Sequence, residues 1–490
     1  MSAGTTRRRV PGPDLLRLPG LGRFVRWRYA RLALQLPLLA LALLAVFDGL
    51  TGRQVAPQNL ATVSVWLHYR GLLVLALLVL GNLFCAACPL MLTRGPSRWL
   101  GRFLPRQTWP RALRNKFLVL GLTVAFLFAY ERFDLWASPW LTAWLILGYF
   151  GAALAVDTLF PAGTFCKYVC PLGNFNFALS HVSPAQITAR DPDVCRSCAG
   201  QYCVNGRVER AGGRDTLGGP AAPLLHLEPL AGAQAFPGCE TTLFVPQMRS
   251  NQDCTLCLNC VRACPHDNVA LAVRVPTRPW TAWRPRADLA LLGTVLLLGG
   301  IANAWAMVPS FRTAAQAVAG VLHTRSEALV LLILLGGLLL GGTGLTLAVF
   351  RLSSRLAGHD EGVWRAARRW GVTMFPLAFV VWAGHTSFHF LTGWASIVPV
   401  TQQALARLGV PAGAPDWTLA ALVPENLLFP LQVALLYAGY GASTYLAVRA
   451  VGRWPAAAPL IVWLTVLAVV TVLILGQPME LRGTLLDGGP

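Results

Sequence analysis

Residues 254–265 have the sequence Cys254-Thr-Leu-Cys257-Leu-Asn-Cys260-Val-Arg-Ala-Cys264-Pro265. This C-x2-C-x2-C-x3-C-P spacing is typical of bacterial proteins that bind two [4Fe-4S] clusters. In such proteins three closely spaced thiolates hold one cluster, and the fourth, which is followed by proline, reaches the other cluster. The run therefore predicts a second group of cysteine ligands elsewhere in the chain.

Four cysteines upstream of this run supply the second group. Cys195, Cys198 and Cys203 are closely spaced, and Cys239 stands alone. If the last cysteine of the run crosses to the other cluster, the eight ligands divide into two sets. The first cluster is then held by Cys195, Cys198, Cys203 and Cys264, and the second by Cys239, Cys254, Cys257 and Cys260.

The stretch from Gly206 to Gly238 separates Cys239 from the other upstream cysteines. It is rich in Gly, Ala, Pro and Leu, and we expect an irregular insertion there. In the standard pattern this ligand follows only three residues after the preceding cysteine. We nevertheless assign Cys239, because no other cysteine is available and Pro237-Gly238 can form the sharp turn that a ligand loop needs.

Zinc sites and disulfides are the alternatives for these eight cysteines. A zinc ion takes four ligands, and its sites do not call for a third cysteine two residues on followed by a Cys-Pro pair. Disulfides are disfavoured in a compartment that keeps thiols reduced, which is the side of the membrane predicted below. The spacing therefore favours iron–sulfur clusters.

The composition indicates a membrane protein. The 490-residue chain is 55% hydrophobic and only 13% charged, with a mean hydropathy of +0.53. A soluble domain of this size does not have such a composition, so we predict a polytopic α-helical membrane protein. Its net charge of +20 comes from Arg clusters beside apolar segments, which the positive-inside rule explains without a nucleic-acid partner.

Nine segments are long and apolar enough to cross a hydrocarbon core of ~30 Å. They are residues 32–50, 62–84, 117–136, 139–160, 287–309, 328–350, 371–393, 427–447 and 456–477. Lys and Arg are concentrated before the first segment and in alternate connections, which predicts a cytoplasmic N-terminus and an external C-terminus. We expect the first segment to be retained as a span, in a bacterial inner membrane.

This topology predicts five parts. They are a basic cytoplasmic N-terminus (1–31), a four-helix membrane domain (32–160), a cytoplasmic two-cluster ferredoxin module of the bacterial type (161–286), a five-helix membrane domain (287–477) and a short external tail (478–490). The cysteine run thus lies between two groups of membrane helices.

The remaining four cysteines form two Cys-Pro pairs at predicted cytoplasmic helix ends. Cys85 and Cys88 close the second span, whereas Cys166 and Cys170 follow the fourth. Spacings of three and four residues place each pair on one face of a helix end, and the following proline is expected to stop that helix. These thiols are candidates for a third metal or cluster site or for redox-active dithiols, and the plainer alternative is buried, unreactive cysteines.

Three histidines lie within predicted spans. His385 and His389 share one helix face, so they could bind one metal ion or donate hydrogen bonds to a quinone. A haem would require a ligand from the opposite side, such as His68. The alternative is that all three are hydrogen-bonded packing residues. Asp157 and Glu131, near predicted helix ends, are expected to be interfacial anchors.

Residues 30–285 resemble the membrane-bound polyferredoxins typified by NapH, NosR and CcoG (also called RdxA or FixG). The shared features are membrane spans, two Cys-Pro motifs at their cytoplasmic ends and a following two-cluster module. The phrases Gly81-Asn-Leu-Phe-Cys85 and Cys264-Pro-His-Asp-Asn-Val269 resemble the branch of FesM-type 4Fe-4S proteins. The chain departs from the pattern in having two residues, not three, within the first Cys-Pro pair, and in a C-terminal half that extends beyond NapH.

The resemblance implies a function in electron transfer. Such proteins relay electrons between cytoplasmic carriers or the quinone pool and a respiratory enzyme or its metal centre, and the chain could be the electron-transfer subunit of an oxidoreductase. The expected cofactors are two [4Fe-4S] clusters, with a further metal, a quinone or a haem as additional candidates. The alternative is an assembly or metal-handling protein that binds or reduces copper, since soft thiolates suit Cu(I).

Overall fold

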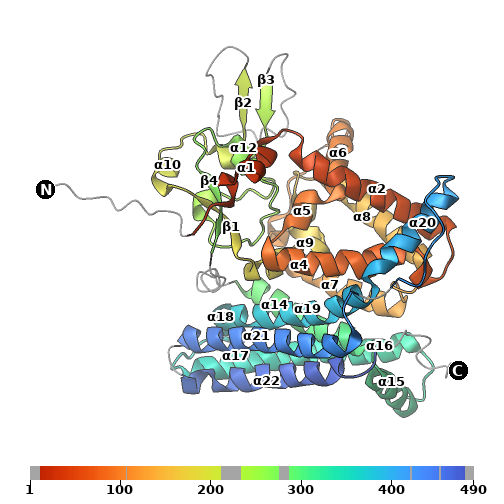
Figure 1. Cartoon of the computed structure of the whole chain (residues 1–490). Helices are drawn as coiled ribbons and strands as arrows, with labels where there is room; N and C mark the ends of the chain where they lie inside the picture. The colour runs from red at the N-terminus through yellow and green to blue at the C-terminus, as the bar shows by residue number, and fades with distance from the viewer. Residues whose placement is uncertain are drawn as a thin grey trace. The chain divides into compact units, whose positions relative to one another are not determined.

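The computed structural model describes residues 12–105, 107–210, 233–274, 286–419, 422–451 and 454–479. Most of these residues are helical, and the described strands form two short two-stranded sheets (Figure 1). The chain folds into two compact units, each built from three separate segments. The cysteine unit comprises Met1–Ala40, Ala76–Arg111 and Phe150–Trp283, and the helical unit comprises Leu41–Leu75, Ala112–Tyr149 and Arg284–Pro490.

Seven helical stretches in the described residues are long and apolar enough to cross a membrane. They are α2 (Ala30–Thr51), Leu60–Val79, α8 (Pro139–Leu159), α14 (Ala287–Trp305), Glu327–Leu356, Val363–Arg407 and α22 (Trp454–Leu475). All seven overlap predicted spans, which confirms a multi-pass helical membrane protein at this level.

Two of the nine predicted spans are not among these seven. The first corresponds to α7 (Phe117–Arg132), whose 16 residues reach about 24 Å, less than the ~30 Å of a hydrocarbon core. The second lies within α21 (Glu425–Val451), which is long enough but carries Gln432, Ser443 and Thr444 among its apolar residues. Seven of the nine predicted spans therefore meet the criterion of length and composition in the part of the chain that the structure describes.

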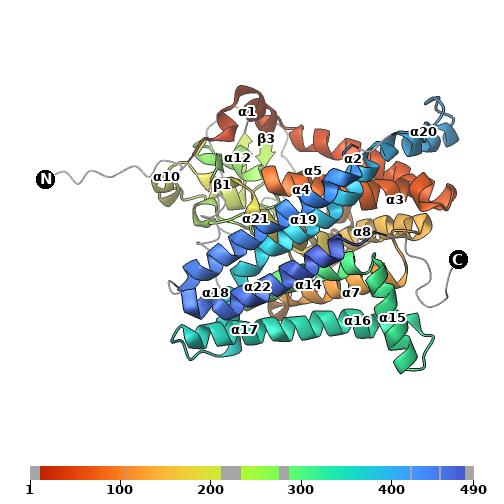
Figure 2. The ribbon, with the colours of Figure 1, turned by 60° about the horizontal axis from the view of Figure 1, so that its bottom comes forward.

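The helical unit is organised around α14. Every residue from Asp288 to Ala304 is buried, as expected for a helix that is apolar on all sides. Small residues allow its neighbours to approach closely: a Cβ on Gly371 would lie 2.3 Å from the Cβ of Ala290. The indole of Trp382, on α19 (Met374–Gly393), donates to the carbonyl of Leu296 at 2.8 Å. In Figures 1 and 2, α14, α19, α21 and α22 run side by side.

A small antiparallel sheet lies in the cysteine unit. Strand β1 (Ala185–Ala189) pairs with β4 (Val269–Val273), with Ala185 opposite Val273 and Ala189 opposite Val269. The N-terminal η1 (Leu15–Arg17) and α1 (Pro19–Arg26) belong to this core, because Leu16 and Val25 are buried in the same cluster as Ile187 and Leu271. The basic segment before the first span is thus in part a folded element of the cysteine unit.

The insertion between Cys203 and Cys239 has ordered ends. Strand β2 (Arg207–Arg210) pairs antiparallel with β3 (Ala233–Phe236), so the expectation of a wholly irregular stretch is wrong there. The backbone at Gly206 has φ +77, in the region that favours glycine, where the chain turns into β2. Residues 211–232 lie outside the described part of the chain.

Candidate functional site

All twelve cysteines lie in the cysteine unit and are free thiols. We group them as the sequence predicted. The first set is Cys195, Cys198, Cys203 and Cys264; the second set is Cys239, Cys254, Cys257 and Cys260; the third set is Cys85, Cys88, Cys166 and Cys170.

Asn268 connects two members of the first set that are far apart in sequence. Its side-chain amide nitrogen lies 3.2 Å from the Sγ of Cys195, on α10 (Pro192–Arg196). Its backbone N–H donates to the Sγ of Cys264 at an N···S distance of 3.4 Å. The crossed arrangement requires this proximity, since Cys264 belongs to the downstream run.

The electrostatics of Cys203 agree with the same grouping. Burial raises the pKa of Cys203 to about 11, and the charges of Cys195, Cys264 and Cys198 raise it further. Cys203 lies on α11 (Tyr202–Asn205). The members of the first set are therefore near enough to influence one another's ionisation.

The second set gathers around α12 (Asn259–Ala263), which carries Cys260. Burial raises the pKa of Cys260 well above its ordinary value, with further contributions from the charges of Cys257, Cys254 and Cys239 and a smaller one from Cys203 of the first set. The Sγ of Cys239 also accepts a hydrogen bond from the backbone N–H of Leu243 at 3.2 Å. The lone Cys239 thus lies with the downstream run, despite the insertion before it.

The loops around these cysteines contain most of the left-handed backbone. Of the eight non-glycine residues with positive φ in the described chain, six lie in these loops. They are Gln201, Thr242, Asp253, Leu256, Leu258 and Asp267. Such conformations cost about 1–3 kcal/mol each for ordinary residues and concentrate at ligand sites. Left-handed residues such as Leu256 and Leu258 are found in the backbone concavities that bind anions and iron–sulfur clusters.

The third set differs from the sequence prediction in its local structure. Cys85 lies on α5 (Leu83–Ala87), whereas Cys88 follows it in extended backbone. Cys166 lies on η6 (Phe165–Val169), and Cys170 is again extended. A residue before proline is forced out of the helical region, and each proline then begins the next helix, η4 (Pro89–Thr93) or α9 (Pro171–Leu179). The prediction that each pair shares one helix face is therefore wrong.

Polar donors nevertheless contact two of the four sulfurs of the third set. The side-chain amide of Asn176 donates to the Sγ of Cys85 at 3.2 Å, and the N–H of Gly173 donates to that of Cys170 at 3.2 Å. Burial raises the pKa of Cys170 to about 12, to which the charge of Cys88 contributes. These relationships bring the two predicted Cys-Pro pairs together in the cysteine unit.

A buried ionic network adjoins the second set, and the sequence analysis missed it. Glu240 follows Cys239 directly and pairs with Arg31 of α2 and with Arg94 of α6 (Arg94–Leu100). The Nη1 of Arg94 lies 2.6 Å from the Oε1 of Glu240, and its Nε lies 3.3 Å from the Oδ2 of Asp157. Burial alone would raise the pKa of Glu240, but the charges of Arg31 and Arg94 hold it at about 2.

This network and its neighbours join the third set to the second. Arg31 donates to the carbonyl of Ala86 at 3.1 Å, and Asn82 donates to that of Cys254 at 2.6 Å. Lys167 donates to the carbonyl of Thr241 at 3.0 Å. The segments that carry the Cys-Pro pairs are thus bonded to the loops that carry Cys239 and Cys254.

Two carboxylates expected to be interfacial anchors are buried. Asp157 takes part in the Arg94 pair, and Glu131 accepts a hydrogen bond from Asn303 at 3.2 Å within the helical unit. Neither has the exposed position of an anchor, because each has a polar partner in the interior. No local sequence pattern predicts these pairs, since the partners are far apart in sequence.

The three predicted histidines lie in the helical unit, and His68 differs from His385 and His389 in its hydrogen-bond partners. Both ring nitrogens of His68 face backbone carbonyls, at 3.0 Å from Val63 and 2.6 Å from Trp394. In this conformation His68 has no nitrogen directed at a haem iron. The rings of His385 and His389 pack edge to face, with centroids 5.0 Å apart. Within the described residues neither ring nitrogen of His385 has a hydrogen-bond partner.

Among the residues that the structure describes, no three or more His, Cys, Asp or Glu side chains are grouped as around a single metal ion. A [4Fe-4S] cube separates its four thiolates by more than one ion does. The fit of the cysteines to such a group therefore rests on the sulfur hydrogen bonds and the left-handed loops described above.

No family model, curated protein or solved structure matches the chain. The resemblance to membrane-bound polyferredoxins is therefore a hypothesis that rests on the motifs.

Proposed function

We propose that this protein is a membrane-bound iron–sulfur electron-transfer protein with two [4Fe-4S] clusters. The observation that carries the proposal is the position of Asn268, whose two N–H groups reach the sulfurs of Cys195 and Cys264. The crossed pattern of a two-cluster protein requires those two cysteines to be neighbours. Bound to the first and second sets, the clusters would supply two one-electron carriers.

The order of the three sets supports a relay. The backbone amide of Cys239 donates to the carbonyl of Cys203, which joins the second set to the first. Asn82 joins the segment before Cys85 to Cys254, which links the third set to the second. The proposed route therefore runs from the first set through the second to the third, or in reverse.

Residues of the chain control the charge and the hydrogen bonding at each set of cysteines. Hydrogen bonds to sulfur from Asn268 and Leu243 stabilise negative charge on the thiolates and tune the reduction potential. The positive charges of Arg31 and Arg94 lie beside the second set and the third set, with Glu240 balancing them. In the proposed topology these groups lie on the cytoplasmic side, and the electrons pass between cytoplasmic carriers or the quinone pool and a respiratory enzyme.

An experiment in proteoliposomes tests this function. The clusters are reduced with dithionite, the reductant is removed, and a soluble menaquinone analogue is added while cluster absorbance is followed. The proposal predicts reoxidation of the clusters with stoichiometric formation of the quinol. Clusters that remain reduced in the presence of the quinone, and also with an added respiratory enzyme fraction, would contradict an electron-transfer function.

One contact favours a second candidate function, in metal handling. The Sγ of Cys166 lies 3.5 Å from the Sδ of Met91, so the third set has a thioether as well as four thiols. Such soft donors suit Cu(I). Changing the four cysteines of the third set to serine separates the candidates: loss of Cu(I) binding with quinone-linked cluster oxidation intact would favour metal handling.

A further inference from the structure

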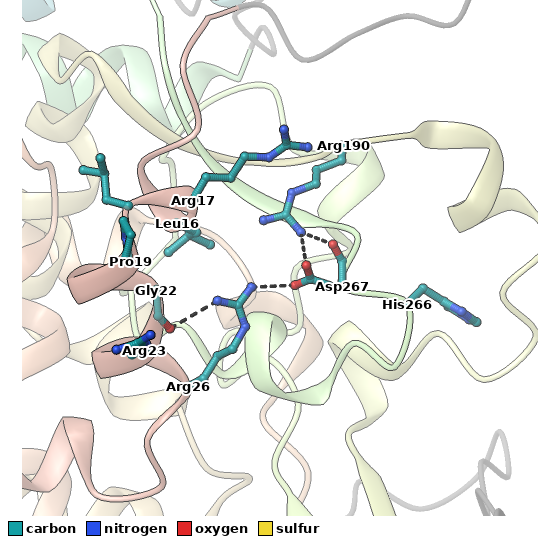
Figure 3. A pocket seen from close by; sticks show the side chains of 10 residues that line it. Leu16, Arg17, Pro19, Gly22, Arg23, Arg26, Arg190, His266 and Asp267 are labelled. Atoms are coloured by element: carbon teal, nitrogen blue, oxygen red, sulfur yellow. Dashed lines mark hydrogen bonds and ion pairs between the residues drawn. The ribbon is translucent and has the colours of Figure 1, made fainter.

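An open pocket of about 490 Å³ lies in the cysteine unit beside α1 (Figure 3). Most of its polar lining is basic. The charged and titratable residues are Arg17, Arg23, Arg26, Arg190, His266 and Asp267.

Asp267 lies between the two inner arginines, as Figure 3 shows. Its Oδ1 is 2.7 Å from the Nη2 of Arg26, and its Oδ2 is 2.9 Å from the Nη1 of Arg190. Arg190 is also 2.9 Å from Asp14. The inner charges are therefore already compensated within the protein.

The two outer arginines are not compensated in this way. The side chain of Arg17 is 77% exposed, and its Nε is 3.9 Å from Asp14, a distance at which an exposed pair contributes little. Arg23 is exposed and has no ion-pair partner among the residues that the structure describes. We call Arg17 and Arg23 the arginine rim.

The pocket shares a loop with the first set. His266 and Asp267 line the pocket, and the next residue, Asn268, donates to the sulfurs of Cys195 and Cys264. The first set also lies nearer the surface than the second. Its neighbours Arg196 and Ser197 are exposed, whereas Thr255 and Asn259 beside the second set are buried.

We propose that the arginine rim docks an acidic protein that carries a one-electron flavin or iron–sulfur centre, which exchanges electrons with the first set. The inference rests on the proposed function and adds the partner's chemistry and its place of contact. In the forward direction the reduced carrier loses one electron and the cluster of the first set gains it, without transfer of atoms. A small anion fits less well, because Asp267 already occupies the inner arginines and only the rim charges remain.

The test measures reduction of the clusters by a photoreduced acidic flavodoxin in stopped flow. In the variant with Arg17→Glu and Arg23→Glu, the second-order rate constant should fall about tenfold at low salt, because the rim then repels the carrier. The difference should shrink at high salt, where these exposed charges are screened. Arg23→Glu alone, which breaks no ion pair of the described chain, should give a smaller loss in the same direction.

The matched control is Arg249→Glu, which makes the same charge change at an exposed position outside the pocket lining. Its rate should stay within about twofold of the parent protein. Reduction by the small methyl viologen radical cation should not slow in any of these proteins, because opposite charge on the rim does not repel it.

Equal rates for the rim variants and the parent protein at low salt would overturn the docking proposal. So would an equal loss in Arg249→Glu, or rim-dependent binding of inorganic pyrophosphate without any effect on the flavodoxin rate, which would indicate a small-anion site. Absence of cluster signals after reduction of the parent protein by methyl viologen would refute the proposed function instead, so the two failures are distinguishable.

Discussion

The backbone N–H of Cys239 donates a hydrogen bond to the carbonyl oxygen of Cys203, with an N···O distance of 2.9 Å. This bond brings the last upstream cysteine of the first set next to the isolated cysteine of the second. Strands β2 and β3 make the approach possible, because their antiparallel pairing returns the chain to its starting point. An insertion can thus separate two ligands in sequence without separating them in space.

The β2–β3 pairing predicts that residues 211–232 are dispensable for cluster binding. Arg210 and Ala233 are paired, so an Asn-Gly turn could replace the intervening residues in a two-residue hairpin. We expect unchanged iron content and unchanged EPR signals in this shortened protein. As a control, Cys239→Ser should lose the second cluster. Loss of that cluster in the shortened protein as well would show that the β2–β3 pairing does not position Cys239.

Asn268 should tune the cluster of the first set. The hydrogen bond from its side-chain amide to the Sγ of Cys195 stabilises the more negative, reduced state of the cluster. Asn268→Ala should therefore lower the midpoint potential of that cluster. A differential effect of about 1 kcal/mol corresponds to about 40 mV for one electron. Redox titration followed by EPR measures the shift.

Asn205→Ala is the matched control for that substitution. The Asn205 amide donates to the carbonyl of Gly200 at 2.9 Å and not to a sulfur, although Asn205 is close to Cys203 in sequence. Its midpoint potential should equal that of the parent protein. Equal potentials for Asn268→Ala and the parent protein would contradict the assigned hydrogen bond to a cluster ligand.

Glu240 should be needed for the stability of the cysteine unit. Glu240→Gln leaves Arg31 and Arg94 without their shared buried carboxylate, and breaking a buried pair costs about 3–5 kcal/mol. We expect a lower thermal unfolding temperature in detergent, as measured by circular dichroism. We also expect faster loss of cluster absorbance.

Glu361→Gln provides the comparison for Glu240. The side chain of Glu361 is 12% exposed and that of its partner Arg369 is 35% exposed, whereas the side chains of the Glu240 pairs are 5–16% exposed. Loss of the more solvated Glu361 pair should therefore cost less, about 1 kcal/mol. Similar unfolding temperatures for the two variants would mean that the Glu240 network contributes no more than this partly exposed pair.

The sequence predicts the proximity of Cys195 and Cys264, which both contact Asn268, better than it predicts the local structure at the Cys-Pro pairs. Spacing alone suggests that Cys264 crosses to the upstream cysteines, because the ligand pattern is a short local motif, residues 254–265. The same local pattern contains the information that Pro89 and Pro171 begin helices, since proline is favoured at the first helical position. Hydropathy likewise locates α2, α14 and α22, whose sequences are predominantly apolar.

Contacts between distant residues are outside the reach of such patterns. Nothing near Glu240 indicates that Arg31 and Arg94 will meet it, because the three residues come from separate segments. The two carbonyl contacts of His68 depend in part on Trp394, which is far away in the chain. Burial of Leu16 in the cysteine core is equally invisible before the fold is known.

EPR spectroscopy of anaerobically purified variants, each with one cysteine changed to serine, tests the central claim most directly. The parent protein should contain about eight iron atoms per chain and show two reduced [4Fe-4S] signals. Cys264→Ser should abolish the same signal as Cys195→Ser, whereas Cys260→Ser should abolish the other, although Cys260 and Cys264 are only four residues apart. An iron-replete protein without [4Fe-4S] signals, or loss of one and the same signal in Cys260→Ser and Cys264→Ser, would contradict the two crossed clusters.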